Sequence, residues 1–209
     1  NNPGGYLDQA FQIADLFIDK NKLIVYTRGR VSLLDENFNA EKAYPYEKIP
    51  IAVLINRGSA SASEIVSGAI QDYGRGLIIG EQTYGKGTVQ NLIDLNRLSS
   101  KKNLNLGQVK LTIAKYYRVN GGSTQNLGVV PDISYPTMID PKDFGESSES
   151  TALPWDEIKS ADFNKFSDLS KFIPDLNKRH LERISTNKDF QYLLEDISIY
   201  KENKKKTFI

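Results

Sequence analysis

The chain has 209 residues, about one to one and a half domains by length, with 39% apolar and 25% charged residues. These fractions lie near the averages of globular proteins and exclude a disordered or fibrous chain. The 27 basic and 26 acidic side chains leave a net charge of +1, so the chain lacks the basic field of a nucleic-acid-binding protein. No apolar run approaches the about 20 residues that a membrane helix needs.

The N-terminal part of the chain predicts a loop, a helix and a strand. Residues 1–5 consist of Asn, Pro and Gly, which favours a loop. Apolar residues recur every three or four positions over 6–18, as in an amphipathic helix, and residues 23–27 are apolar and β-branched, as in a strand. The mixed, polar stretch 29–49 gives no clear assignment. The chain opens without an initiator methionine or a signal sequence, so we interpret it as a fragment.

The next part of the chain predicts a strand–helix–strand unit. Residues 51–55 form a continuous apolar run, typical of a strand that is covered on both faces. A helical period follows over 62–73, Gly74 supplies the helix end, and residues 77–79 form a second apolar strand. Two strands joined by a helix in this way form a right-handed crossover, which predicts an α/β fold.

Two longer strands are predicted over 88–95 and 108–119, and Asn120-Gly121 supplies the positive φ angles of a tight turn. The composition then changes twice. We expect a core over residues 1–136, a linker over 137–154 and a charged, helical C-terminal extension over 155–209.

The residue types that are rare in the chain restrict its chemistry. Cysteine is absent, which excludes disulfides, thiolate zinc sites and thiol nucleophiles. The single histidine, His180, excludes a site built from several imidazoles. Because His180 lies in a charged stretch, we expect it at the surface. A serine–histidine–aspartate site stays possible only if His180 itself is the base, and a serine nucleophile otherwise needs a base of another type.

The segment Gly58-Ser-Ala-Ser-Ala-Ser-Glu64 follows a predicted strand and opens a predicted helix. A serine in such a turn holds its hydroxyl clear of the backbone, with the positive end of the helix facing any oxyanion. Ser61 is the best placed of the three serines, because Ala62 follows it with a backbone N–H. The same residues match a capping box, in which Ser61 only closes the helix end, and Ser59 is an alternative cap. Both interpretations stay open on this stretch alone.

Lys86 stands between two glycines, which is unusual for a solvated surface charge. Gly80, Gly85 and Lys86 have the spacing of a phosphate-binding loop, but Gly87 stands where that loop needs Ser or Thr for Mg²⁺. The other interpretation makes Lys86 the general base for Ser61. An ordinary lysine pKa of about 10.4 leaves almost no free amine at neutral pH, and burial without a carboxylate partner lowers that pKa.

Gln90 follows Lys86 by four positions and is a candidate to orient the amine. In a strand the two side chains share a face but their backbones lie about 13 Å apart. In a helical turn the two side chains stack. The sequence does not decide between the two geometries, and an ordinary polar strand residue is the alternative for Gln90.

Three motifs together resemble the C-terminal processing peptidases, serine–lysine endopeptidases of the S41 type in bacterial envelopes and chloroplast lumens. The motifs are residues 58–64, Tyr73-Gly-Arg75 and Gly85-Lys-Gly-Thr-Val-Gln90. Residues 116–125 and 152–156 resemble the tail-specific branch of the family, and the resemblance covers nearly the whole chain. It implies the family's α/β fold, a crotonase- or ClpP-like spiral of ββα units followed by a helical C-terminal extension, and it implies no metal, nucleotide or other cofactor.

Carried over by position, the resemblance makes Ser61 the nucleophile, Lys86 the general base and Gln90 the residue that positions the lysine. The backbone N–H groups of Gly5 and Ala62 match the two oxyanion donors. The resemblance thus implies a serine endopeptidase that cleaves the C-terminal tails of proteins through an acyl-enzyme.

The resemblance also implies partners and a location. Substrates would be proteins or peptides with unstructured C-termini, and the location would be the bacterial periplasm or cell envelope. Members of the family carry a PDZ domain, which we do not find in these residues and expect upstream in the full-length chain. Two alternatives stay open: a non-catalytic ligand- or protein-binding homologue on the same fold, and a scaffold whose helical end holds partners.

Overall fold

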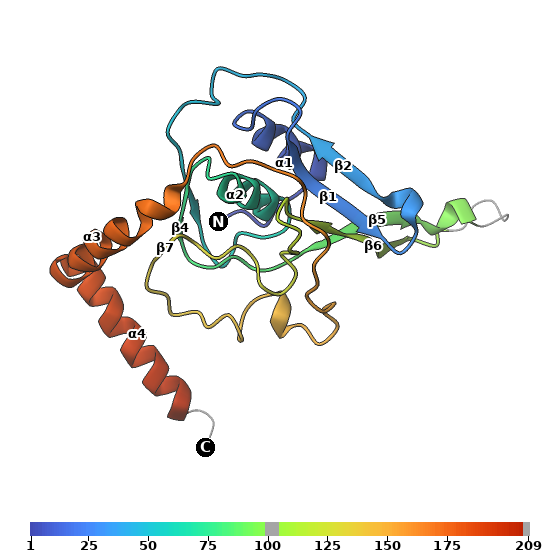
Figure 1. Ribbon diagram of the computed structural model, residues 1–209. Coiled ribbons are helices and arrows are strands. Elements are labelled where there is room, and N and C mark those ends of the chain that lie inside the picture. Colours follow the sequence, from blue (N-terminus) through green and yellow to red (C-terminus); the bar gives the residue numbers. More distant parts are fainter. Residues whose placement is uncertain (99–104, 207–209) are drawn as a thin grey trace.

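The computed structural model describes residues 1–98 and 105–206 (Figure 1). In chain order the helices and strands are α1 (Leu7–Asp15), β1 (Leu23–Gly29), β2 (Glu36–Asn39), β3 (Ala52–Ile55), α2 (Ala62–Asp72), β4 (Leu77–Gly80), β5 (Thr88–Asp94), β6 (Gln108–Tyr117), β7 (Ile133–Ser134), α3 (Ile173–Thr186) and α4 (Lys188–Lys206). Within the described ranges no helix combines the length and apolar character that crossing a membrane requires.

Two sheets and two helices build the core. The larger sheet is antiparallel with the strand order β2-β1-β6-β5, and the smaller sheet is parallel with the order β3-β4-β7. Helix α2 joins the parallel pair β3 and β4 and packs against α1, β1 and β4. This arrangement confirms the predicted strand–helix–strand unit.

Helix α2 carries the centre of the core on one face. Ile65, Ala69 and Ile70 recur at helical spacing, and all three are buried. They belong to one apolar cluster with Ile24 of β1 and Ile78 of β4. Burial of an aliphatic side chain of this size stabilises the fold by about 1.5–3 kcal/mol, so this cluster fixes the position of α2 and of the turn that precedes it.

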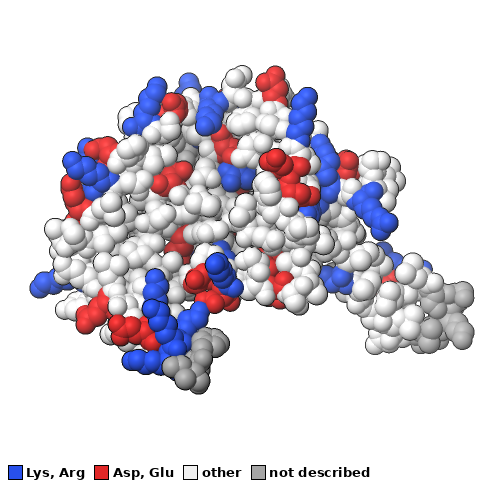
Figure 2. All heavy atoms as spheres, turned by 60° about the horizontal axis from the view of Figure 1, so that its bottom comes forward, with Lys and Arg blue, Asp and Glu red and all other residues white. Residues whose placement is uncertain are grey.

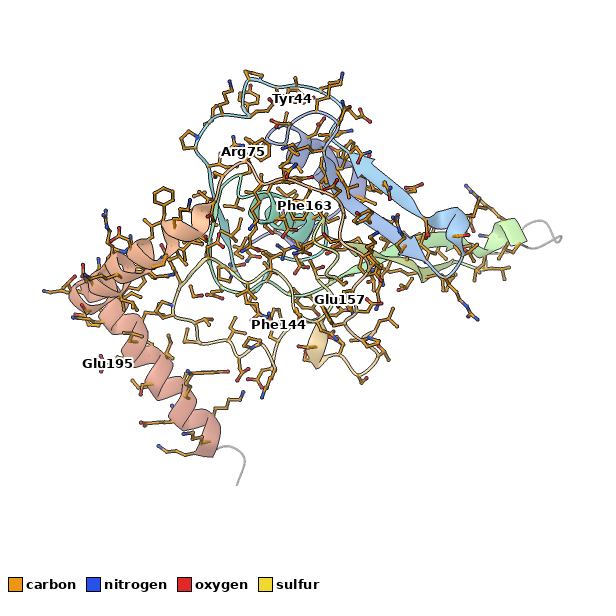
Figure 3. The ribbon with its side chains drawn as sticks, in the orientation of Figure 1. Tyr44, Arg75, Phe144, Glu157, Phe163 and Glu195 are labelled. Carbon is orange, nitrogen blue, oxygen red and sulfur yellow. The ribbon has the colours of Figure 1, made fainter. Side chains whose placement is uncertain are left out.

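The C-terminal end of α2 is held by a segment from the charged C-terminal extension. Tyr73 is buried, and its hydroxyl donates a hydrogen bond to the Leu23 carbonyl (2.7 Å). Phe163 and Phe166 meet the Tyr73 ring edge to face, with centroid distances of 5.5 and 5.9 Å, and Phe163 lies over α2 in Figure 3. Residues that follow the predicted linker therefore complete the core beside α2.

His180 occupies a buried position, so the prediction of a surface position was wrong. Its side chain is 4% exposed, and its ring stacks on Tyr135 with a centroid distance of 4.8 Å. Nε2 lies 3.2 Å from the Ser134 carbonyl, and Arg183 donates to Nδ1 (2.6 Å). His180 is buried by tertiary contacts, because α3 packs on the end of β7 and because the rings of Tyr135, which follows β7, and Phe190, in α4, cover the imidazole. Figure 1 shows α3 and α4 leading away from the core.

Strand β3 differs from its prediction on one face. The apolar run predicted a strand covered on both faces, but Leu54 is 73% exposed. Among the described residues β3 is the edge strand of the smaller sheet, and the face that carries Leu54 is left open to solvent. Ile55, the next residue, is buried against the core as predicted.

Strands β5 and β6 form an arm that extends away from the rest of the molecule (Figure 1). Their antiparallel pairing runs from Thr88 opposite Lys115 to Asp94 opposite Gln108, with an irregularity between Val89 and Gln90. The base of this arm lies next to the turn that precedes α2, because Tyr116 of β6 contacts Ser61.

The charged side chains of the surface are mixed in sign. Figure 2 shows acidic and basic side chains interspersed over one face of the molecule, with basic groups gathered at the end of α4.

Candidate active site

One cavity of about 390 Å³ brings together all five residues that the resemblance assigned to the site. Ser61, Ala62, Lys86, Gln90 and Gly5 line it. We call this space the Ser61 cavity. The residues come from three separate parts of the chain: the N-terminal loop, the junction between the turn and the start of α2, and the segment 86–90 that leads into β5.

Ser61 has an unusual backbone conformation for the first residue of a helix. Its φ is +56° and its ψ is −118°, whereas an N-cap residue ordinarily lies in the β region. A non-glycine residue held in such a region costs about 1–3 kcal/mol. A strained turn between a strand and a helix also carries the nucleophilic serine of the α/β-hydrolases, where it exposes the hydroxyl.

The capping box predicted as the alternative is present in its residues, but no side-chain cap hydrogen bond is made by the Ser61 hydroxyl within the described chain. Ser61 is the N-cap residue of α2 and forms a capping box with Glu64, whose carboxylate accepts a hydrogen bond from the Ser61 N–H (2.6 Å). Capping alone does not require a positive φ, which is the feature that distinguishes this turn. In either role the Ser61 side chain lies at the positive end of α2.

Lys86 has no carboxylate partner within salt-bridge distance among the described residues. Its amine donates a hydrogen bond to Gln90 Oε1 (3.0 Å) and not directly to the Ser61 hydroxyl. Burial lowers the pKa of Lys86, and the like charge of Lys110 lowers it further, while Glu146 and Glu64 act in the opposite direction. The site thus disfavours the ammonium form of this lysine.

The contact between Lys86 and Gln90 comes from neither of the two regular geometries that the spacing allowed. Lys86 precedes β5, in an irregular segment that turns at Gly85 (φ +94°), and Gln90 lies in β5 next to the strand irregularity. Together these two distortions bring the side chains within hydrogen-bond distance. The phosphate-loop alternative was wrong, because a strand and not a helix follows Lys86.

Glu64 connects the Ser61 turn to the Lys86 segment, a role that the sequence did not reveal. Its side chain is fully buried, and its carboxylate accepts four hydrogen bonds. One oxygen accepts from the hydroxyl of Thr83 and the N–H of Gly85 (2.7 Å). The other accepts from the N–H groups of Ser61 (2.6 Å) and Lys86 (3.0 Å). A single carboxylate therefore fixes both backbones that carry the candidate nucleophile and base.

Burial raises the pKa of Glu64 to about 7, and the four donors oppose this effect. The four donors match an ionised carboxylate, which only accepts hydrogen bonds. The capping-box pattern pointed to Glu64 only as the partner of Ser61. The two loops that supply the other donors are fixed by the tertiary fold, so no local pattern predicts them.

Tyr116 makes a second connection between the same two segments. Its buried hydroxyl contacts the backbone carbonyls of Ser61 (3.0 Å) and Lys86. Tyr116 also lines the Ser61 cavity. In the sequence it stood out only as part of a family-like segment, without a role.

The N-terminal loop packs directly on the Ser61 turn. The Asn2 carbonyl accepts hydrogen bonds from the Ala60 N–H (3.0 Å) and the Ser63 hydroxyl (2.7 Å). Gly4 has a φ of +91°, and a Cβ there would lie 2.8 Å from the Ala62 nitrogen, so only glycine allows this close approach.

The backbone N–H groups of Gly5 and Ala62, the two predicted oxyanion donors, have no acceptor among the described residues. The adjacent Gly4 N–H donates instead to the Asn2 side chain (2.9 Å), which distinguishes the two neighbouring glycines. Both unpaired groups line the cavity that Ser61 lines.

Arg57 ties the segment after β7 to the back of the site. Its guanidinium is buried and donates to the carbonyls of Thr83, Pro141 (2.9 Å) and Phe144 (2.5 Å). The Phe144 ring meets Tyr84 edge to face at 5.6 Å, and Figure 3 shows Phe144 on the segment that crosses below the core. The loop before Lys86 is thereby held from the side opposite to the cavity.

Comparisons with known proteins identify the family of this chain. Residues 1–135 match peptidase family S41, and residues 139–209 match the C-terminal domain of tail specific protease. A tail-specific protease of Haemophilus influenzae is 41% identical to this chain, over 100% of the chain and 30% of that protein. A carboxy-terminal-processing protease of Bartonella bacilliformis is 48% identical, over 63% of the chain and 28% of that protein.

A solved structure has the same core. The photosystem II D1 C-terminal processing protease superimposes with a TM-score of 0.54 and 32% sequence identity, over 68% of this chain and 33% of that one. The chain spans about 30% of the length of the curated relatives that it matches. The family match covers well over half of the residues and includes every residue of the Ser61 cavity. The chain therefore belongs to peptidase family S41, and its mixed α/β core with helices at the C-terminus is the core of that family.

Proposed function

We propose that this chain is the catalytic part of a serine endopeptidase that processes the C-terminal tails of proteins, with Ser61 as nucleophile and Lys86 as general base. The observation that carries the proposal is the placement around one cavity of a strained serine, a lysine amine without a carboxylate partner and the backbone N–H groups of Gly5 and Ala62, which have no acceptor among the described residues. An amine serves as a base only in its neutral form, and burial favours that form at this site.

The reaction begins when the Ser61 hydroxyl attacks the carbonyl carbon of the scissile peptide bond and gives its proton to the Lys86 amine. The carbonyl oxygen becomes an oxyanion, which accepts hydrogen bonds from the N–H groups of Gly5 and Ala62. The C–N bond then breaks, and the Lys86 ammonium returns the proton to the leaving amine. Water hydrolyses the resulting ester of Ser61, again with Lys86 as base.

Gln90 holds the amine before the reaction. Lys86 Nζ donates to Gln90 Oε1 in this structure, and a lysine side chain has enough rotatable bonds to move the amine toward the Ser61 hydroxyl. General-base contacts commonly tighten only when substrate binds, so the missing direct contact is compatible with the mechanism. In this proposal Gln90 is a positioning residue and does not take a proton.

The substrate class follows from the family and from the relatives. The H. influenzae and B. bacilliformis relatives are named for tail-specific and carboxy-terminal processing activity, which supports the C-terminal tails of proteins as substrates. That these tails are unstructured stays a prediction from the resemblance. The upstream PDZ domain and the location in the bacterial periplasm or cell envelope stay predictions from the resemblance.

A fluorophosphonate probe tests the identity of the nucleophile. In the intact protein we expect the probe to label Ser61, as measured by mass spectrometry of the proteolysed product. Ser67, which donates a hydrogen bond to the Ser63 carbonyl inside α2, is the matched serine that we expect to stay unlabelled. Peptide cleavage is measured in parallel, because serine–lysine enzymes can resist such probes. A protein that neither reacts with the probe nor cleaves peptides would instead be a binding homologue.

Substitution of Gln90 tests its positioning role. We expect Gln90→Ala to lower kcat/KM by about tenfold, because it removes one hydrogen bond to the amine. Gln90→Glu places a negative charge beside Lys86 Nζ, which raises the pKa of the lysine, so activity at neutral pH falls further and recovers as the pH rises. Asn91→Asp is the matched control, because successive side chains of β5 point to opposite faces. Equal pH profiles for Gln90→Ala and Gln90→Glu would contradict the assignment.

A further inference from the structure

We propose that Lys110 is a positioning residue that keeps Lys86 uncharged by electrostatic repulsion across the Ser61 cavity. The proposal rests on the proposed function, because it concerns the lysine that acts there as general base. Lys110 lies in β6, on the arm, and it was not among the residues that the sequence suggested for the site.

The register of the arm places Lys110 beside the lysine–glutamine pair. Gln90 lies opposite Thr112, and Leu92 lies opposite Lys110. Residues that face each other across paired strands share one face of the sheet, as do residues two positions apart. Gln90 and Lys110 are therefore diagonal neighbours on the same face, and both line the Ser61 cavity together with Lys86.

Lys110 has no carboxylate within salt-bridge distance among the described residues. The acidic side chain on the same face of the arm is Asp94, and its Oδ1 accepts two hydrogen bonds from Asn96. The Lys110 charge is thus not neutralised locally. An unpaired cation that lines the same cavity as a second lysine disfavours the charged form of that lysine.

The other charged groups that act on Lys86 have the opposite effect. Glu64, from α2, and Glu146, from the short helical turn Glu146–Ser148, both favour the ammonium form, and Lys110 is the charged group that opposes them. Burial and Lys110 act in the same direction on the pKa of Lys86. Since Lys110 is exposed at the surface of the arm, its contribution depends on ionic strength, whereas the contribution of burial does not.

The test compares the pH dependence of kcat/KM in the intact protein and in three variants, with a peptide substrate that lacks charged side chains. Lys110→Gln removes one unit of charge and Lys110→Glu removes two, so we expect the midpoint of the profile to rise in that order. At neutral pH the loss should be about threefold for Lys110→Gln and about tenfold for Lys110→Glu. The high-pH plateau should stay unchanged, because the Lys86 amine is then neutral in every variant.

Two controls separate electrostatics from structure. Lys110→Arg keeps the charge and should keep the wild-type profile, and Lys178→Gln removes a charge from α3, which lies on the other side of the molecule from the arm (Figure 1). About 1 M salt should bring the midpoint of the wild-type profile close to that of Lys110→Gln. Superimposable profiles for the wild type and both Lys110→Gln and Lys110→Glu, or a lowered plateau without a shift, would overturn the proposal. Failure of the proposed function is recognised separately, as full activity in Lys86→Ala.

Discussion

Substitution of Ser61 by alanine is expected to lower kcat/KM for peptide cleavage by about 10⁴-fold, since it removes the only atom that can form the acyl-enzyme. Lys86→Ala should cost a similar factor, at the upper end of the about 10²–10⁴ that a general base contributes. The double variant should have about the same kcat/KM as the less active of the two single variants, because the two groups act in one step and their losses do not add. Steady-state cleavage of a fluorogenic peptide by the intact protein measures all three values.

Lys86→Arg separates the charge of the lysine from its basicity. Arginine keeps the positive charge and a similar length, but its guanidinium does not lose a proton at any pH of interest. We therefore expect Lys86→Arg to be as inactive as Lys86→Ala. Ser67→Ala and Lys142→Ala are matched controls outside the Ser61 cavity and should keep wild-type activity. An active Lys86→Arg variant would show that the lysine acts through its charge and not as a base.

Glu64→Gln is expected to have the second largest effect, although this side chain does not line the Ser61 cavity. An amide offers only one acceptor oxygen, so it leaves two of the four donors facing an NH₂ group. Each unsatisfied buried donor costs about 1–3 kcal/mol, so the two predict a loss of about 2–6 kcal/mol in the free energy of unfolding. Denaturant titration of the intact protein measures this loss.

The same substitution should lower kcat/KM by about 100-fold, because it loosens the backbones that carry Ser61 and Lys86. Burial raises the pKa of this carboxylate to about 7. Below that pH it binds a proton and can no longer accept all four hydrogen bonds, so activity should fall more steeply than the protonation of Lys86 alone predicts. Glu64→Gln should keep the limb that belongs to Lys86 but lose this additional drop, which a purely structural defect would leave in place. Glu195→Gln, an exposed position on α4 that points away from the core in Figure 3, is the matched control.

Local patterns predicted much of the fold. The helical period before Gly74 and the apolar strands on either side of α2 predicted the strand–helix–strand unit correctly. Such patterns can be recognised locally, because the spacing of side chains on one face is set by the backbone geometry of a helix or strand. Strand β2 lies in the stretch that gave no clear assignment, since a short polar edge strand has no distinctive period. The burial of His180 and the exposure of Leu54 were not predicted, because both depend on which distant element lies opposite.

The sequence by itself determined the fold class, the absence of thiols, the presence of a single imidazole, and five candidate residues that the structure brings to one cavity. Only the tertiary structure decided how those residues are held: the positive φ of Ser61, the contact between Lys86 and Gln90, and the buried carboxylate of Glu64 between them. The reason is physical. A residue's type and spacing limit the chemistry that it can perform, whereas its pKa and its hydrogen-bond partners depend on chain segments that only folding brings together.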